Sequence, residues 1–190
     1  MKVQPRLAIR VVFAAVAAIL LLAGCGGSGT SSSSSQSPTP SPSPSPSKVP
    51  GYTALDACKL VTQDDASTAL GPPVQNMGSA GACIYGKSDG SATLFVIGTV
   101  FADATAAQAA NPDQIAASLN GAYAIANAHA VTGIGDKAVE YSVSGSGTNG
   151  LVIFVFKSNA VILIMLTPTT DSNKIETLAR GAVNHLPAAT

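Results

Sequence analysis

Hydrophobic residues are distributed differently before and after residue 49 of this chain. Residues 11–22 form an unbroken apolar run, whereas residues 26–48 contain no apolar residue larger than proline. After that, short apolar runs alternate with polar turns up to the C-terminus, which is typical of a folded domain. The pattern predicts three parts: residues 1–24, residues 25–48 and a domain at residues 49–190.

Several segments of the domain have the apolar spacing and the flanking residues of helices. In the last of them, Thr170 or Asp171 can cap a helix whose apolar side chains recur on one face. Thr62 likewise precedes residues 63–70, with Asp64 and Asp65 in the first turn, where the helix dipole favours negative charge. Further short helices are predicted at residues 55–60, after Asp103, after Asn111 and at residues 122–127.

Other segments alternate or cluster their apolar residues as strands do. Residues 82–85 and 93–101 flank a turn rich in Gly, Ser and Asp, which predicts a hairpin. Residues 139–143 alternate apolar side chains with polar ones, so we expect a half-buried strand. The sequence therefore predicts an α+β fold, in which a twisted antiparallel sheet of about five strands, built from hairpins, packs with helices and ends in a C-terminal helix.

Residues 151–156 and 160–166 are apolar at every position. Strands of this kind are buried on both faces, so something apolar has to cover each side of the sheet. Two interpretations remain open at this point. Either helices and long loops close a core over both faces, or one face lines an apolar cleft that accepts a lipid or another hydrophobic ligand.

The charge balance excludes one class of partner. The 190 residues carry ten basic and ten acidic side chains, without a basic cluster, so we expect no nucleic-acid binding. Three of the basic residues lie in residues 1–24, which leaves seven against ten, a net charge of −3, in the rest of the chain.

The apolar run at residues 11–22 is too short to cross a membrane. Twelve helical residues extend about 18 Å, against a hydrocarbon core of roughly 30 Å. A basic start, a short apolar core and small residues at the end are the features of a secretory signal peptide. We therefore predict that residues 1–24 are removed and that the domain lies outside the cytoplasm.

The small residues at the end of this segment lead directly into a cysteine. The sequence Leu22-Ala23-Gly24-Cys25 resembles the lipobox of bacterial lipoproteins. The resemblance implies that the sulfur of Cys25 carries a diacylglycerol, that cleavage occurs before Cys25, and that an acyl chain such as palmitate is added to the new amino group. Two or more chains give stable anchoring, so the expected location is the extracytoplasmic face of the cell membrane. The alternative is an ordinary signal peptide with an incidental cysteine.

Residues 26–48 contain eleven serines and five prolines. This composition cannot bury enough apolar surface to offset the entropy of ordering, so we predict a disordered linker between the anchor and the domain. The Ser-Pro alternation at residues 41–47 favours an extended conformation. A proline-rich ligand for a recognition domain is the alternative interpretation.

The two remaining cysteines, Cys58 and Cys83, form an even pair in a compartment that we expect to be oxidising. A disulfide is the favoured interpretation, and a pair of buried free thiols or a metal pair is the alternative. Neither cysteine has the CxxC spacing of a redox or zinc site.

Three short motifs imitate catalytic or nucleotide-binding sequences. Residues 86–90 match the GxSxG elbow of serine hydrolases around Ser88, but that elbow needs a strand-to-helix turn, and a strand follows here. Residues 145–150 match GxGxxG, and residues 133–138 match its alanine variant, yet both lead into strands rather than helices. We interpret all three as turns.

The remaining titratable residues do not suggest a catalytic or metal site. His129 is expected in a loop and His185 in the last turn of a helix. The acidic side chains are interpreted as helix caps and solvated charges; these are Asp64, Asp65, Asp136, Glu140 and Asp171. We therefore predict no enzyme activity, no catalytic or metal-binding residues and no cofactor.

A second resemblance covers roughly residues 52–186. The motifs DACKL (56–60), QDDA (63–66), ACIY (82–85) and GIGDKA (133–138), with the terminal hairpin and helix, are similar to a large family of small actinobacterial lipoproteins. The resemblance implies a disulfide between Cys58 and Cys83 and an α+β extracytoplasmic domain, and most members have no assigned activity. The leading hypothesis is a lipid-anchored, non-catalytic binding or sensing domain at the cell surface, with a hydrophobic small molecule as one candidate ligand. The alternatives are a structural or protein-binding component of the cell envelope and, less favoured, a hydrolase using Ser88.

Overall fold

The computed structural model of the protein describes residues 50–78, 81–119, 123–145 and 147–190. Cys25, the signal segment and the linker lie outside the described residues, so the interpretations of those parts remain predictions. No helix in the described part of the chain is both long enough and apolar enough to span a bilayer.

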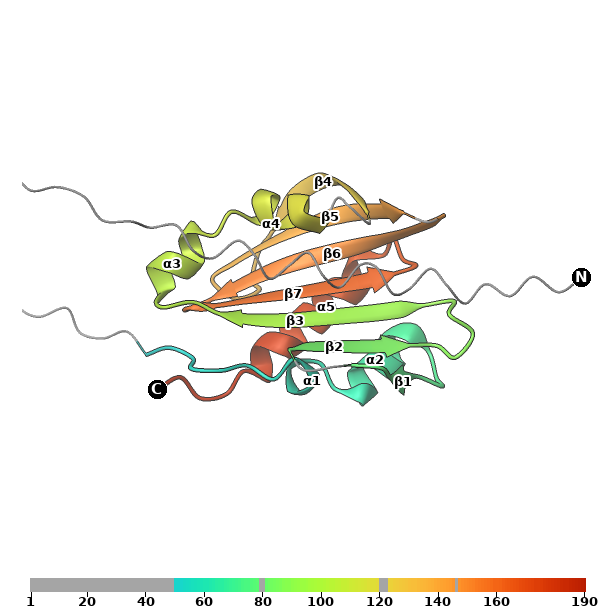
Figure 1. The fold of residues 1–190 in the computed structure, drawn as a ribbon, viewed down its shortest axis with the longest axis horizontal. Coiled ribbons are helices and arrows are strands. Elements are labelled where there is room, and N and C mark those ends of the chain that lie inside the picture. The colour runs from blue at the N-terminus through green and yellow to red at the C-terminus, as the bar shows by residue number, and fades with distance from the viewer. Residues whose placement is uncertain (1–49, 79–80, 120–122, 146) are drawn as a thin grey trace, which may run out of the picture. The chain divides into compact units, whose positions relative to one another are not determined.

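One antiparallel sheet forms the centre of the domain (Figure 1). Its strand order is β1-β2-β3-β7-β6-β5-β4, so the last two strands of the chain lie in the middle and β4 lies at an edge. The strands are β1 (Gln75–Asn76), β2 (Ala82–Gly86), β3 (Thr93–Val100), β4 (Ala124–Val131), β5 (Lys137–Gly145), β6 (Thr148–Lys157) and β7 (Ala160–Thr167). The α+β class, the antiparallel sheet and the C-terminal helix are confirmed, with seven strands rather than about five.

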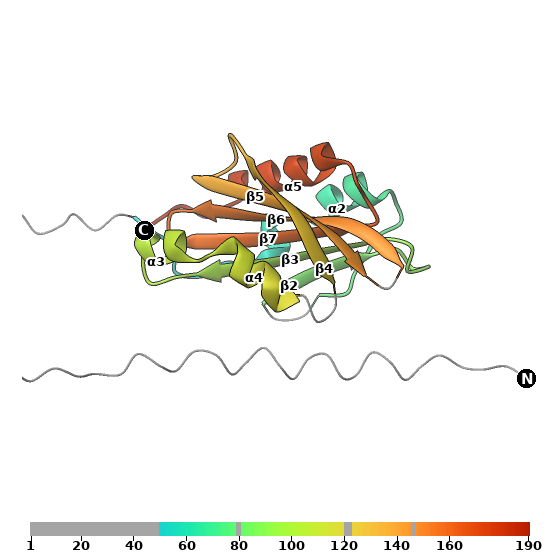
Figure 2. The same cartoon turned by 90° about the horizontal axis from the view of Figure 1, so that it is seen from above.

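Helices cover both faces of the sheet. The helices are α1 (Ala57–Leu60), α2 (Gln63–Leu70), α3 (Ala104–Ala109), α4 (Pro112–Leu119) and α5 (Ser172–Asn184). Figure 2 shows α2 and α5 on one side of the sheet and α3 and α4 on the other. The domain therefore has three layers, with the sheet between two sets of helices.

The helices begin where side-chain caps were expected. Thr62 and Asp65 form a capping box at the start of α2, each side chain accepting a hydrogen bond from the backbone N–H of the other residue. Asp103 caps α3 and Asp171 caps α5, in each case by accepting from a backbone N–H of the first turn. These bonds satisfy N–H groups that a helix leaves without internal partners.

Both faces of the two central strands lie in packed cores. The side chains of Ile153 and Ile164 lie in the core on the α5 face, while Phe154 and Leu163 lie in the second core on the opposite face. All residues from Leu151 to Phe156 and from Ala160 to Leu166 are buried. Of the two interpretations left open by the sequence, the structure therefore favours the closed core over an apolar cleft.

The disulfide between Cys58 and Cys83 is confirmed, with the two Cα atoms 5.0 Å apart. It joins α1 to β2, close to a second connection in which the buried Tyr85 hydroxyl donates to the Val61 carbonyl at 2.8 Å. Burial, followed by the charges of Asp65 and Asp56, raises the pKa of Tyr85, so the hydroxyl keeps its proton. Together these contacts hold α1, a helix of one turn, against the sheet.

Asn159, in the turn between β6 and β7, fixes the point where the chain enters the domain. Its buried amide accepts from the Tyr52 N–H at 2.6 Å and donates to the carbonyls of Tyr52 and Phe101, both at 2.9 Å. The neighbouring Ser158 hydroxyl donates to the Pro50 carbonyl at 3.0 Å. The segment that follows the linker is therefore attached to one end of the central hairpin.

Two elements differ from the sequence prediction. The predicted helical turn at residues 122–127 is wrong from residue 124 on, where β4 begins and runs to Val131. This strand is irregular, with a bulge between Ala126 and His129 and a positive φ of 55° at Asn127. Its alanines favour a helix locally, but pairing with β5 determines the conformation instead. The short edge strand β1 was not predicted.

Candidate functional site

The candidate site lies on the α5 face of the sheet, on β4 and β5 beside the start of α5. One row of paired residues crosses the sheet from His129 through Glu140, Ile153 and Ile164 to Val96. Directly paired residues direct their side chains to the same face of a sheet. Glu140 is therefore on the same face as the α5 core, one strand beyond Ile153.

A groove of about 440 Å³, lined by both polar and apolar residues, runs along this region. Glu140, Ser142 and Ser144, the alternate polar positions of β5, form its floor. β4 provides one side, and the other is provided by the start of β6 and the loop into α5, which includes Thr170. We refer to this feature as the Glu140 groove.

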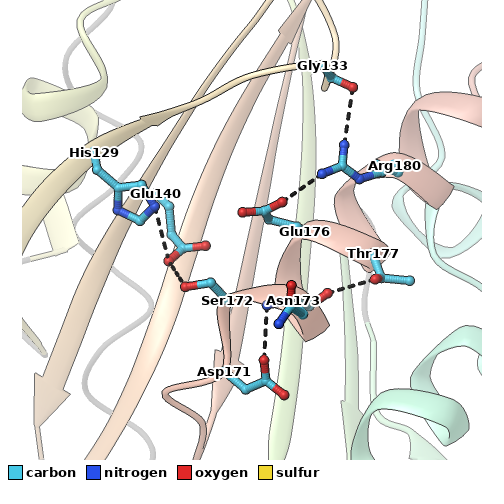
Figure 3. Close-up of polar contacts among 9 residues, drawn as sticks. All are labelled: His129, Gly133, Glu140, Asp171, Ser172, Asn173, Glu176, Thr177 and Arg180. Atoms are coloured by element: carbon cyan, nitrogen blue, oxygen red, sulfur yellow. Dashed lines mark hydrogen bonds and ion pairs between the residues drawn. The ribbon is translucent and has the colours of Figure 1, made fainter.

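Glu140 is the only carboxylate among the described residues that line the groove, and it is 1% exposed. Its Oε1 accepts a hydrogen bond of 2.7 Å from the Ser172 hydroxyl and lies 3.7 Å from Nε2 of His129 (Figure 3). Its Oε2 is buried and has no hydrogen-bond partner within the described residues. The carboxylate therefore has one oxygen in use and one free.

The sequence around residue 171 determines where Ser172 lies. Asp171 caps α5, so Ser172 is the first helical residue and its hydroxyl reaches Glu140 on the neighbouring strand. Figure 3 shows a second connection, further along α5. The Arg180 guanidinium donates to the Glu176 carboxylate at 2.7 Å and to the Gly133 carbonyl at 3.3 Å. These contacts connect α5 to the β4–β5 loop and so hold the two sides of the groove together.

Burial of a half-satisfied carboxylate is unfavourable for folding. Leaving a buried polar group without a partner costs about 1–3 kcal/mol, and more for a charged group. Groups of this kind are concentrated at sites that use them. Oε2 keeps the capacity to accept a hydrogen bond or to bind a positive charge, but it is buried, so a ligand in the groove reaches it only after a neighbouring side chain moves.

The three polar residues are not arranged as a serine hydrolase triad. In that triad a histidine lies between the serine and the acid. Here Glu140 lies in the middle, with Ser172 and His129 both contacting Oε1. The geometry fits recognition by a carboxylate better than activation of the serine.

Two other depressions have polar groups that are already paired. The one between α2 and α5, about 320 Å³, is lined by Asp65, Thr68 and Thr177, each of which makes a hydrogen bond within or next to its own helix. The second depression lies on the opposite face of the sheet and is lined by Asp113 and Tyr141. The Tyr141 hydroxyl donates to Asp113 at 2.7 Å, and burial followed by this bond raises the pKa of Tyr141. Neither depression presents a free buried charge.

The motifs considered in the sequence occupy the predicted turns. Ser88 lies in an exposed hairpin turn between β2 and β3, so the strand-to-helix geometry of a hydrolase elbow is absent there. The GxGxxG match joins β5 to β6, and residues 133–138 lead into β5. No group of three or more His, Cys, Asp or Glu side chains suited to a metal ion occurs in the described ranges.

Three predictions about charged residues can be compared with the structure. Asp136 is half exposed and pairs with Lys157 at 2.7 Å. Burial raises the pKa of Asp136, but hydrogen bonds from Lys157 and the Ser158 N–H outweigh burial and lower it.

His185 directly follows α5, with Nδ1 3.0 Å from the Leu60 carbonyl oxygen. The loop position predicted for His129 is wrong, because His129 lies in β4.

The prediction that Glu140 is a solvated charge is also wrong. The alternation in β5 was read as one buried and one solvated face, and Glu140 falls on the polar face. However, β5 pairs with β6, which is apolar on both faces, so both faces of β5 adjoin a core at this point. An isolated acidic residue opposite such a strand is a signal that could have identified Glu140.

Comparison with known proteins adds little to this description. No protein-family model matches the chain, and no curated protein matches it. Among solved structures, the extracellular domain of PknH from Mycobacterium tuberculosis is similar to it, with 12% sequence identity and a TM-score of 0.47. The match covers 67% of this chain and 93% of that chain.

Proposed function

We propose that this protein is a lipid-anchored extracytoplasmic domain that binds a small polar ligand in the Glu140 groove. The observation that carries the proposal is the buried Glu140 carboxylate, whose Oε2 lacks a partner within the described residues while it lines an open groove. A sheet with two packed cores holds this group in place. Rigid elements position binding groups more precisely than loops do.

The disulfide supports a location outside the cytoplasm, because such bonds persist mainly in oxidising compartments. The short apolar segment and the lipobox-like sequence before Cys25 support export and anchoring. The interpretation with a hydrophobic ligand has lost its support, because the apolar strands form a closed core.

The position of the groove within the domain suits a ligand that arrives from solution. The chain enters at the β6–β7 turn, where Ser158 and Asn159 hold residues 50–52. The groove extends to Asn149, which lies eight residues before Lys157 on β6. Eight residues of a strand extend about 27 Å. The groove therefore reaches the end of the sheet opposite to residues 50–52.

A ligand screen with a blocked variant tests binding. Ser144 is exposed on the groove floor, so Ser144→Phe should fill the groove without disturbing a core, and Ser88→Phe makes the same change on a distant turn. We expect saturation-transfer NMR on the full chain in a nonionic detergent to detect small polar compounds whose binding is lost in Ser144→Phe and kept in Ser88→Phe. If no compound distinguishes the two variants, the groove is not a binding site.

Anchoring has a separate test. Cys25→Ser removes the sulfur that would carry the diacylglycerol, so we expect the variant to leave the membrane fraction or to keep its signal segment uncleaved. The measurement is fractionation with the mass of the intact protein, compared with Ser28→Ala as a neighbouring control. Cleaved Cys25→Ser protein retained on the membrane at the wild-type level would show that lipid on Cys25 is not the anchor.

A further inference from the structure

We propose that the ligand of the Glu140 groove is a small organic cation of the alkylammonium class, with the Glu140 carboxylate as its counter-ion. This inference rests on the function proposed above and specifies the ligand. It follows from the charge, the hydrogen-bonding capacity and the accessibility of the groups that line the groove.

The first argument is charge. The described residues that line the groove include Glu140 and no lysine or arginine, and their one other ionisable side chain is His129, which contacts Oε1 and not Oε2. Arg180, on the nearby face of α5, is already paired with Glu176 and the Gly133 carbonyl. A buried carboxylate is stable only when a positive charge or hydrogen bonds compensate it. Ser172 supplies one hydrogen bond to Oε1, and a cation in the groove would compensate Oε2.

The second argument is hydrogen bonding. An ammonium group has three N–H donors and no acceptor. One donor would bond Glu140 Oε2 once the carboxylate is uncovered, and the hydroxyl of Ser142, the next residue on the same face of β5, offers a second acceptor beside its contact from Asn127 at 3.4 Å. The small side chains of Ala124 and Ala126, which pair with Ser144 and Ser142, leave room for an alkyl chain along the groove.

The start of α5 is the feature that would favour an anion instead, because helix N-termini attract negative charge. In this protein two carboxylates already lie at the start of α5. The Asp171 carboxylate accepts from the Asn173 N–H, and Glu140 accepts from Ser172. An anionic ligand would therefore meet two carboxylates near the helix terminus, whereas a cation would meet complementary charge.

The third argument is accessibility. His129 lies beside the carboxylate, with its side chain 52% exposed and its Nε2 3.7 Å from Glu140 Oε1. Exposed side chains change rotamer on a picosecond to nanosecond timescale. Rotation of this imidazole away from Glu140 gives a ligand a path to the carboxylate with the sheet unchanged.

The test compares three probes of similar shape that differ in charge. We expect titration calorimetry on the full chain in a nonionic detergent at neutral pH to show that n-butylammonium binds about 10- to 100-fold more tightly than butyramide, as one charge-assisted hydrogen bond predicts. Butyrate should bind more weakly still. Because this comparison is made on the wild-type protein, it does not depend on the folding of a variant.

Glu140→Gln supplies the second part of the test. We expect it to weaken n-butylammonium binding at least 10-fold and to remove the preference over butyramide. Asp64→Asn neutralises an exposed carboxylate on α2, outside the groove lining, and should alter the affinity less than twofold. Urea unfolding of both variants checks that each is folded.

The outcomes separate the ligand class from the proposed function. If butyramide or butyrate binds as tightly as n-butylammonium, or if Glu140→Gln keeps the preference for the cation, the ligand is not recognised by this carboxylate and the cation proposal is wrong. If neutral or anionic compounds bind the wild type but not Ser144→Phe, the groove is a binding site for another class of ligand. A screen in which no compound depends on the groove would remove both proposals.

Discussion

Phe154→Ala should lower the free energy of unfolding by about 4 kcal/mol, the largest effect that we expect from one substitution. Phe154 is fully buried at the centre of β6, between β5 and β7. Its ring meets Tyr141 edge to face, with the centroids 5.6 Å apart. The substitution removes this contact and leaves a cavity in the core on the α3 and α4 side of the sheet, which the neighbouring strands cannot close.

Urea unfolding of the full chain measures this effect, with Phe154→Leu as the matched control. Leucine retains most of the volume, so its loss should be about 1–2 kcal/mol. Phe95→Ala, on the same side of the sheet but only partly buried, should lie between the two. A loss below about 1 kcal/mol for Phe154→Ala would show that this second core is not closed.

Removal of the Cys58–Cys83 disulfide should have the next largest effect, a loss of about 3–4 kcal/mol by the entropy of the loop that it closes. The two cysteines are 25 residues apart, and the loop contains α1, α2 and β1. These elements are short and cannot hold their conformation alone. In the unfolded chain without the bond, this segment gains conformational freedom that the disulfide otherwise restricts.

The measurement compares urea unfolding of the Cys58→Ala/Cys83→Ala double variant with that of the wild type, with and without a reducing agent. The reductant should destabilise the wild type to the level of the double variant and leave the double variant unchanged. The hydrogen bond from Tyr85 to Val61 should still hold α1 in the native state. Equal stability of the two proteins without reductant would contradict the role assigned to the bond.

The parts of the fold that could be predicted from sequence are those with a local signal. Thr62, Asp103 and Asp171 cap helices as expected, because capping depends on a side chain and a backbone group only two or three residues away. The turns around Ser88 and Asn159 were recognisable for the same reason. Residues 151–166 identified the centre of the sheet because burial on both faces requires an apolar residue at every position.

The candidate site could not be predicted, because it depends on contacts between distant segments. Glu140 and Ser172 are 32 residues apart, and nothing local to either residue shows that α5 begins beside β5. β4 is formed by pairing with β5 against the helix preference of its alanines. The sequence therefore specified the sheet and its helices more clearly than the groove at the edge of that sheet.

The position of a bound cation is the most direct test of the account. Amide chemical shifts of the isotopically labelled full chain should be recorded during titration with n-butylammonium. We predict that the largest shifts occur at Glu140, Ser142, Ser144 and Ser172, and that they disappear in Glu140→Gln and persist in Asp64→Asn. Shifts concentrated between α2 and α5, or equal shifts in the two variants, would contradict the central claim that the Glu140 carboxylate binds the ligand.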